Sequence, residues 1–154
     1  MKKDLHSADT LFVLLLFALF MITALFITVS GAIAYRNSAV QMEERFNRQT
    51  CINYITAKVR ANNDADKITV GELEGINALC IIDNIGGINY ITYIYQYEGS
   101  VRELFCNAEI SLPPSSGTSL TEAKAISFEK DGSLLEITLT DNEDNTTLFY
   151  INAV

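Results

Sequence analysis

Histidine, cysteine, tryptophan and proline are scarce in this sequence of 154 residues. It has one histidine, His6, together with three cysteines, two prolines and no tryptophan. No Ser/His or Cys/His pair can therefore form within residues 62–154 of one chain, and zinc-ligand spacing is absent. A glycine-rich phosphate loop is also missing, because Gly86 and Gly87 lack a following Lys-Ser/Thr pair. The sequence predicts a protein that is not an enzyme, with no cofactor, metal site or small-molecule substrate.

The three cysteines allow one intramolecular disulfide at most and leave one thiol over. Cys80 and Cys106 both follow apolar residues, so we expect small buried side chains there. A Cys80–Cys106 bridge is the alternative. The sequence therefore does not predict a fold that is stabilised by disulfide bonds.

Charge is absent from residues 10–35, a run of 26 residues with one glycine and no proline. At about 1.5 Å per residue a helix of this length covers roughly 39 Å, more than the ~30 Å of bilayer hydrocarbon. Lys2, Lys3 and Arg36 flank the run. The sequence therefore predicts a transmembrane helix at residues 10–35, preceded by a cytoplasmic tail at residues 1–9, and the lipid bilayer is the first expected partner.

Glycine and proline are both missing between Gly31 and Gly71, which predicts that the helix continues past the membrane to residue 61. We call residues 36–61 the stalk. Apolar side chains recur there at helical spacings, and we expect this stripe to pack on the following domain, with Arg45 and Arg48 lying off it. The stripe is Ala39, Met42, Phe46, Ile52, Ile55 and Val59.

Basic and acidic residues are unevenly divided along the chain. Residues 1–60 hold seven basic and four acidic residues (net +3), whereas residues 61–154 hold four basic and fifteen acidic residues (net −11). Nucleic acids and anionic surfaces normally require clustered Lys and Arg. We therefore expect no nucleic-acid binding by residues 62–154, which we call the head.

The head has the two-residue apolar period of β-strands, and its segments are bounded by Gly, Asp, Asn or Pro. We expect four or more strands to form one antiparallel meander, so the fold class is α+β. The proline-containing segment 113–117 is expected to carry the chain across the sheet between two hairpins. The expected strands are residues 67–70, 78–82, 88–97, 101–106, 125–129, 134–140 and 147–152.

Two further segments of the head are rich in tyrosine or in acidic residues. Tyr90, Tyr93, Tyr95 and Tyr97 occupy both faces of one strand, which favours packing within a central strand over an aromatic binding surface. The acidic run at residues 141–145 lacks the pattern of a calcium loop. A solvated hairpin tip is the better interpretation.

Taken together, this layout resembles the type IV pilins and the minor pseudopilins of secretion and competence systems, in particular pilin-like membrane proteins of Gram-positive bacteria. Residues 93–102 (YIYQYEGSVR) are similar to the apolar strand, Gly turn and Arg-bearing strand of such subunits. Residues 54–60 (YITAKVR) are similar to the end of their first helix. The resemblance implies a pilin-like fold, other pilin-like subunits and an assembly platform as partners, and an extracytoplasmic head.

Pilin precursors are cut after a glycine that precedes a Phe-Thr-Leu-x-Glu stretch, and this chain has neither that glycine nor the glutamate. If a cut occurs, Ala8 would replace the glycine and Asp9 would become the new N-terminus. The alternative is that Ser7 or Asp9 caps the helix. A signal-peptidase site at residues 32–34 is disfavoured by the length of the apolar run.

The sequence thus predicts a membrane-anchored pilin-like subunit with a cytoplasmic N-terminus, a minor component or initiator of a type IV-like filament or pseudopilus. Arg45 and Arg48 are the expected assembly residues of the stalk, and their reversal to Glu is expected to leave the head folded. The alternative is a single-pass tether for an extracytoplasmic interaction domain that does not polymerise.

Overall fold

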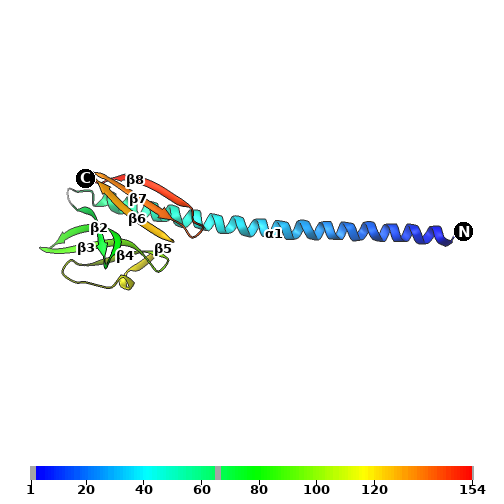
Figure 1. The fold of residues 1–154 in the computed structure, drawn as a ribbon, viewed down its shortest axis with the longest axis horizontal. Helices are drawn as coiled ribbons and strands as arrows, with labels where there is room; N and C mark the ends of the chain where they lie inside the picture. The colour runs from blue at the N-terminus through cyan, green and yellow to red at the C-terminus, as the bar shows by residue number, and fades with distance from the viewer. Residues whose placement is uncertain (1–2, 65–66, 154) are drawn as a thin grey trace. The chain divides into compact units, whose positions relative to one another are not determined.

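The computed structural model describes residues 3–64 and 67–153 and begins with a single long helix, α1 (Lys3–Ala61). Its 59 residues include the apolar run and the stalk, as expected from the lack of glycine and proline after Gly31 (Figure 1). The helix ends with Lys58 and Arg60 in its last turn, where cations complement the helix dipole. The side chain of Asn62 donates to the Lys58 carbonyl at 2.9 Å and satisfies one of the last carbonyl groups.

The chain divides into two compact units, Met1–Met42 and Glu43–Val154. The first unit consists of α1 up to Met42. The second unit contains the last turns of α1 and all eight strands.

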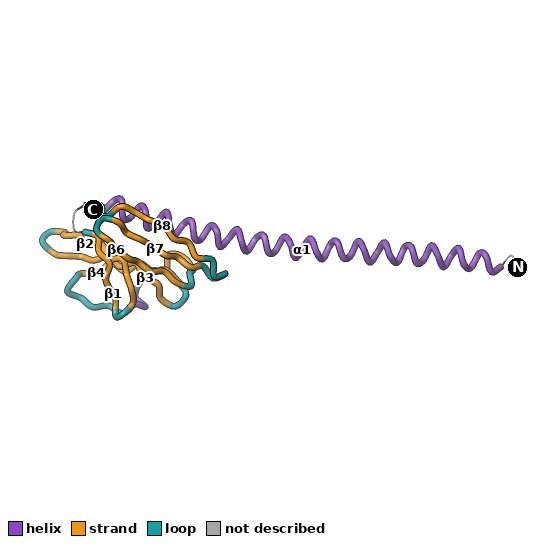
Figure 2. Tube along the Cα trace, turned by 45° about the horizontal axis from the view of Figure 1, so that its top comes forward, coloured by secondary structure: helices purple, strands orange, loops and turns teal. Residues whose placement is uncertain are grey.

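The second unit is an α+β structure with two antiparallel sheets, which confirms the predicted fold class (Figure 2). A five-stranded sheet has the order β1-β2-β3-β4-β5, and a three-stranded sheet has the order β6-β7-β8. Every strand therefore lies beside its neighbour in sequence within its sheet. The strands are β1 (Ile68–Leu73), β2 (Ile76–Ile85), β3 (Ile88–Tyr97), β4 (Ser100–Asn107), β5 (Thr118–Glu122), β6 (Ala125–Asp131), β7 (Leu134–Thr140) and β8 (Thr146–Asn152).

The sequence missed β5 and the role of the proline segment. β5 reads TSLTE, with a single large apolar residue and no apolar alternation that would mark it as a strand. The prolines do not carry the chain across the sheet between two hairpins. They precede and begin a short 3₁₀ turn, Pro114–Ser116, which returns the chain from β4 to β5 at the adjacent position.

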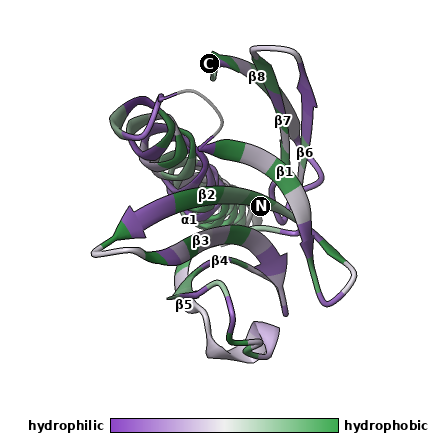
Figure 3. Cartoon of the chain, turned by 90° about the vertical axis from the view of Figure 1, so that its left-hand side faces the viewer, coloured by the Kyte–Doolittle hydropathy of each residue, from purple (hydrophilic) through white to green (hydrophobic). Residues whose placement is uncertain are grey.

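The main core lies between the last turns of α1 and one face of each sheet. Cys51, Ile55 and Val59 of α1 are almost completely buried, with Ile52 partly buried beside them. They pack in one cluster with apolar residues of both sheets, such as Ile94 and Ile137. Figure 3 shows the backbone of α1 and of the strands of both sheets, viewed from the end of the second unit. Burial of such side chains contributes about 1.5–3 kcal/mol each.

The predicted stripe was wrong at Ala39, Met42 and Phe46, all of which are exposed, Met42 and Phe46 by 72% and 71%. At about 100° per residue, Phe46 lies nine residues from Ile55 and therefore on the opposite side of the helix. Arg48 lies seven residues from Ile55, two full turns away, and so shares the buried face. The predicted stripe combined two different faces of the helix.

A second, smaller core covers the opposite face of the five-stranded sheet. It contains Tyr95, which is fully buried, with Tyr93 and Tyr97 packed at its border. The Tyr95 hydroxyl donates to the Pro114 carbonyl at 2.7 Å. The prediction that these tyrosines pack within a central strand is therefore confirmed, and the 3₁₀ turn forms part of their cover.

The two sheets are joined by side chains that hydrogen-bond to the backbone of the other sheet. The Asn77 amide of β2 donates to the Phe128 carbonyl at 3.2 Å and accepts from the Phe128 N–H at 2.8 Å. Lys130 of β6 donates to the Ile68 carbonyl of β1 at 2.7 Å. These bonds satisfy backbone groups at facing sheet edges that would otherwise lack partners.

Gly117 allows the 3₁₀ turn to approach Tyr95, and we expect Gly117→Ala to lower the free energy of unfolding of the second unit by about 1–3 kcal/mol. A methyl group there would overlap the Tyr95 hydroxyl and lie 3.1 Å from its Cζ atom. Urea unfolding measures the effect. Ser116→Ala, in the adjacent exposed position, is the control and should change stability by less than ~0.5 kcal/mol. Equal stability of the Gly117 variant and wild type would contradict this packing.

Candidate functional site: the membrane helix and its attachment to the head

The first half of α1 is the most distinctive functional feature of the chain. In the described part of the chain, one helix, Asp9–Ala61, is long and apolar enough to cross a membrane, with a mean hydropathy of 2.9 in its most apolar window. None of that window is buried in the structure. Large apolar side chains such as Leu25 and Phe26 are 67% and 72% exposed. This fits a single-pass membrane anchor.

Two hydroxyl groups within the apolar run are satisfied inside the helix. Thr23 donates to the Phe20 carbonyl at 2.8 Å, and Thr28 donates to the Ala24 carbonyl at 2.9 Å. An unpaired hydroxyl costs several kcal/mol in hydrocarbon, so these bonds reduce the cost of placing threonine in a bilayer.

The residues considered for processing, Ala8 and Asp9, lie within α1. The helix already includes Lys3, so neither Ser7 nor Asp9 is its N-cap, and the capping alternative was wrong. No glycine or proline separates Lys3 from the apolar run, which explains why the helix extends further than the capping signal suggested. Cleavage between Ala8 and Asp9 stays a prediction.

The two stalk arginines differ in their surroundings. Arg45 is exposed, whereas Arg48 is partly buried and its Nη1 lies 2.8 Å from Oδ2 of Asp141. The expectation that Arg48 lies off the face of the helix that packs on the head was therefore wrong, for the reason of helical phase given above. Its role in assembly stays a prediction, but reversing its charge would also disturb a contact within its own chain.

Asp141 is the centre of this contact and is 3% exposed. Its Oδ1 accepts from the backbone N–H groups of Glu143 (3.0 Å) and Asn145 (2.8 Å), and its Oδ2 also accepts from the Asn145 amide (3.1 Å). Burial raises the pKa of Asp141, but these hydrogen bonds and the charge of Arg48 outweigh burial and hold the pKa below its usual value. The predicted solvated hairpin tip is therefore confirmed at residues 142–145, which are exposed, and was wrong at Asp141, which is buried against the helix.

A second polar contact joins α1 to β4. Tyr54 donates a short hydrogen bond to Oε2 of Glu103, and Lys58 Nζ lies 2.8 Å from Oε1 of the same carboxylate. Hydrogen bonding to Glu103 raises the pKa of Lys58 despite its partial burial. Burial is the largest cause that raises the pKa of Tyr54, followed by its bond to Glu103. Each side-chain oxygen of Glu103 therefore has one donor from α1.

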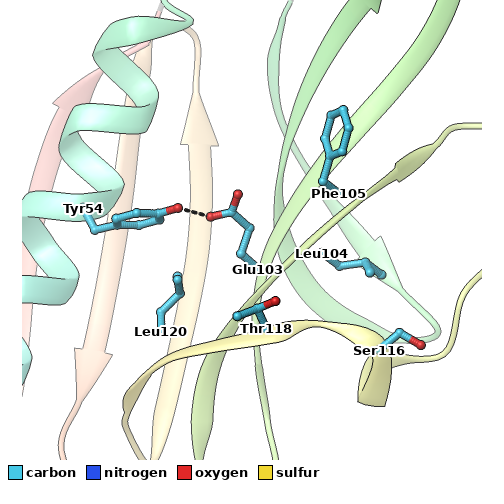
Figure 4. Close-up of a pocket in the computed structure, with 7 residues that line it drawn as sticks. All are labelled: Tyr54, Glu103, Leu104, Phe105, Ser116, Thr118 and Leu120. Atoms are coloured by element: carbon cyan, nitrogen blue, oxygen red, sulfur yellow. Dashed lines mark hydrogen bonds between the residues drawn. The ribbon is translucent and has the colours of Figure 1, made fainter.

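A surface hollow of about 380 Å³ lies beside the Tyr54–Glu103 contact (Figure 4). In this view Tyr54 of α1 and Glu103 of β4 point toward each other. The lining also includes Phe105, Ser116 and Thr118. Sequence reasoning missed Glu103 and Asp141 as partners of the helix. The available signal was that Tyr54 and Lys58 are four residues apart and flank the buried positions Ile55 and Val59.

The cysteines are free thiols, and all three are buried. Cys80 of β2 and Cys106 of β4 are separated by β3, with Tyr93 directly opposite Cys80. Two strand spacings amount to about 9.5 Å, beyond the ~6.8 Å that a disulfide spans between Cα atoms. Burial raises the pKa of Cys51 to about 12 and that of Cys80 to about 11. Burial and a raised pKa therefore both disfavour reaction of these thiols in the folded protein.

No group of three or more His, Cys, Asp or Glu residues within the described ranges is arranged to hold a metal ion. The acidic turn at residues 141–145 is stabilised by hydrogen bonds within the protein and by Arg48 instead.

Comparison with known proteins gives a match to a family model. Residues 46–142 match the family model described as a domain of unknown function, DUF4860. Neither the curated proteins nor the solved structures contain a significant match. The matched region begins two residues before Arg48 and ends one residue after Asp141, so their ion pair joins its two ends. Since the match covers more than half of the sequence, this chain belongs to the DUF4860 family.

Proposed function

We propose that this protein is a non-enzymatic, membrane-anchored, pilin-like subunit, a minor component or initiator of a type IV-like filament or pseudopilus. The observation that carries the proposal is α1 itself. Its first half exposes an uninterrupted apolar surface, and its last turns form part of the core of the second unit. In this proposal the N-terminus is cytoplasmic and the head is extracytoplasmic.

The proposed mechanism is mechanical. The bilayer would hold each subunit through residues 10–35, and the same apolar surface would contact neighbouring helices when subunits enter a filament. Helix association in apolar surroundings depends on van der Waals packing and does not require additional hydrophobic burial. Replacing the lipid contacts of this helix by contacts with neighbouring helices therefore does not require a large input of free energy. Other pilin-like subunits and an assembly platform would be the partners.

Exposed residues of the stalk also support contact between copies. Met42 and Phe46 lie beyond the predicted membrane segment and are exposed. Arg45, between them in sequence, has no ion pair with any residue that the structure describes. Apolar side chains beside an unpaired cation would suit the acidic head of a neighbouring copy. The head's charge of −11 argues against nucleic acid as the partner.

The experiment is a shear assay in cells that carry the native filament genes. We expect a fraction of the wild-type chain in the sheared surface material. The double change Arg45→Glu and Phe46→Glu should reduce that fraction at least ~10-fold, because it removes both the cation and an exposed apolar contact. Asn53→Glu, at another exposed position of α1, is the control and should assemble normally.

The competing function is a single-pass tether for an extracytoplasmic interaction domain that does not polymerise. A tether would leave the wild-type chain entirely in the membrane fraction after shearing, and the double change would have no effect. That pair of results would contradict the filament proposal and favour the tether.

A further inference from the structure

An apolar stripe of α1 faces away from the head and has no cover within the described chain. Phe46 lies nine residues from Ile55, which is on the opposite side of the helix at about 100° per residue. Tyr35, Ala39 and Met42 precede Phe46 at spacings of four, three and four residues, so they continue the same face. All four are exposed, Tyr35, Met42 and Phe46 by 79%, 72% and 71%. We call these four residues the outer stripe.

The spacing of the outer stripe is that of a helix that packs against a second helix. Apolar residues that alternate at spacings of three and four form the seam of a two-stranded coiled coil. The same alternation continues toward the N-terminus at Ala32 and Thr28, whose small side chains permit close approach of helices inside a bilayer. Thr28 donates its hydroxyl to the Ala24 carbonyl at 2.9 Å, so this donor needs no acceptor on a second helix. The outer stripe is therefore continuous with a face of the predicted span that suits helix contact.

Opposite charges flank the outer stripe. Glu43 lies on one flank and Arg45 on the other, and neither has an ion pair with any residue that the structure describes. In a parallel pair of helices related by a two-fold axis, each flank of one helix meets the other flank of its partner. Glu43 of each copy therefore lies on the side of Arg45 of the other copy, and these charges are complementary. Arg36 shares the flank of Glu43 and meets the uncharged Ser38 of the other copy.

We propose that the outer stripe pairs with the outer stripe of a second copy of this chain, as two parallel helices related by a two-fold axis along the membrane normal. Two copies held in one membrane with one orientation present the stripe at the same height. The head packs on the opposite side of α1, around Ile55, so the two heads lie on the outer sides of the helix pair. Two helices of about 10 Å diameter separate them, more than the ~8 Å over which charges act at physiological ionic strength. The net charge of −11 on each head therefore opposes this pair only weakly.

This pair goes beyond the proposed function. A two-fold pair is closed, whereas a filament requires an open arrangement of subunits, so the inference concerns the chain while it is held in the membrane. A shared membrane raises the effective concentration of the copies, which favours pairing through a short seam. A tether that never polymerises would form the same pair.

The test is disulfide crosslinking of the full chain, under mild oxidation, in phosphatidylcholine vesicles that contain no other protein. The native thiols are buried, so Ala39→Cys introduces one accessible thiol per chain. With helix axes about 8–10 Å apart and a helix radius of about 2.3 Å, the two facing Cα atoms lie roughly 4–6 Å apart, which a disulfide can span. We expect at least ~10-fold more dimer than from Asn37→Cys, an exposed position on the opposite side of the helix, where the two Cα atoms would be more than ~12 Å apart. Wild type, without an added thiol, should give none.

A carboxylate on the outer stripe should abolish this crosslink. Adding Met42→Glu to the Ala39→Cys chain should reduce the dimer at least ~10-fold, because two carboxylates would then face each other across the axis in an apolar seam. Gln41→Glu adds the same charge at an exposed position off the stripe and should leave the dimer unchanged. None of these positions is buried, so each variant keeps the packing of its head.

The flanking charges provide a second variant of the same test. Arg45→Glu in the Ala39→Cys chain should reduce the dimer about 3-fold, because both flanks of the seam would then carry a carboxylate. Exchanging the two charges, with Glu43→Arg and Arg45→Glu together, should restore the dimer.

Three results would overturn the proposal. Equal crosslinking from Ala39→Cys and Asn37→Cys would mean that the dimers arise from random collision. Crosslinking that persists with Met42→Glu would mean that the membrane spans hold the copies together without the outer stripe. A chain that gives no dimer from Ala39→Cys would exclude the second copy. Filament assembly is measured separately in the shear assay, so failure of one inference is distinguishable from failure of the other.

Discussion

Arg48→Glu is expected to lower the free energy of unfolding of the second unit by about 3–5 kcal/mol. Asp141 is 3% exposed, and Arg48 is the cation paired with its carboxylate in the described structure. The substitution would leave this carboxylate without its cation and place a second carboxylate beside it. A loss of this size is a large fraction of the stability of a small domain.

Arg45→Glu is the matched control for this prediction. It makes the same charge change three residues earlier, at an exposed position, and should alter stability by less than ~0.5 kcal/mol. Urea unfolding in detergent can be followed by the reaction of the buried thiols with a maleimide dye, because these thiols become accessible only when the second unit opens. Equal urea midpoints for the two variants would refute the role assigned to the Arg48–Asp141 pair.

Three aspartates in the middle of the apolar run, at Leu19, Ile22 and Phe26, are expected to release the chain from the membrane. Each acidic residue at the centre of a membrane helix costs about 2.5–3.5 kcal/mol, so the three together oppose insertion by roughly 7–10 kcal/mol. Carbonate extraction should move the triple variant from the pellet to the supernatant, whereas wild type stays in the pellet.

Val40, Met42 and Phe46 provide the control for membrane release. They are also large apolar residues of α1 with 45–72% of their surface exposed, but they lie beyond the predicted span. Aspartate at these three positions should leave the chain in the pellet. Release of the control variant would mean that the membrane segment extends further along α1 than residue 35, and retention of the Leu19, Ile22 and Phe26 variant would contradict the anchor.

Much of the fold could be predicted because the signals are local. The hairpin turns are marked in the sequence by residues that favour turns. Glu98 and Gly99, for example, adopt the positive φ angles (49° and 76°) that a tight hairpin requires. The absence of glycine and proline predicted the length of α1. β5 was missed because its five residues carry little alternation and its position depends on pairing with β4.

The candidate site was less predictable, because it depends on contacts between residues far apart in the sequence. Asp141 is 93 residues from Arg48, and Glu103 is 49 residues from Tyr54. Local pattern identified the turn at residues 141–145 as polar but could not indicate that Asp141 is buried against the helix. Such a pair forms only after the sheets and the helix have packed, and packing excludes water from it.

The sequence by itself determined an apolar helix long enough to cross a membrane, the continuation of that helix to residue 61, the antiparallel strands and the acidic character of the head. These properties follow from hydropathy, helix propensity and turn chemistry, which act over a few residues. Tertiary structure alone decided the division into two sheets, the face of α1 that is buried, and the partners of Arg48 and Glu103. Each of these depends on which surfaces meet when the chain packs, and burial and backbone pairing between distant segments select that arrangement.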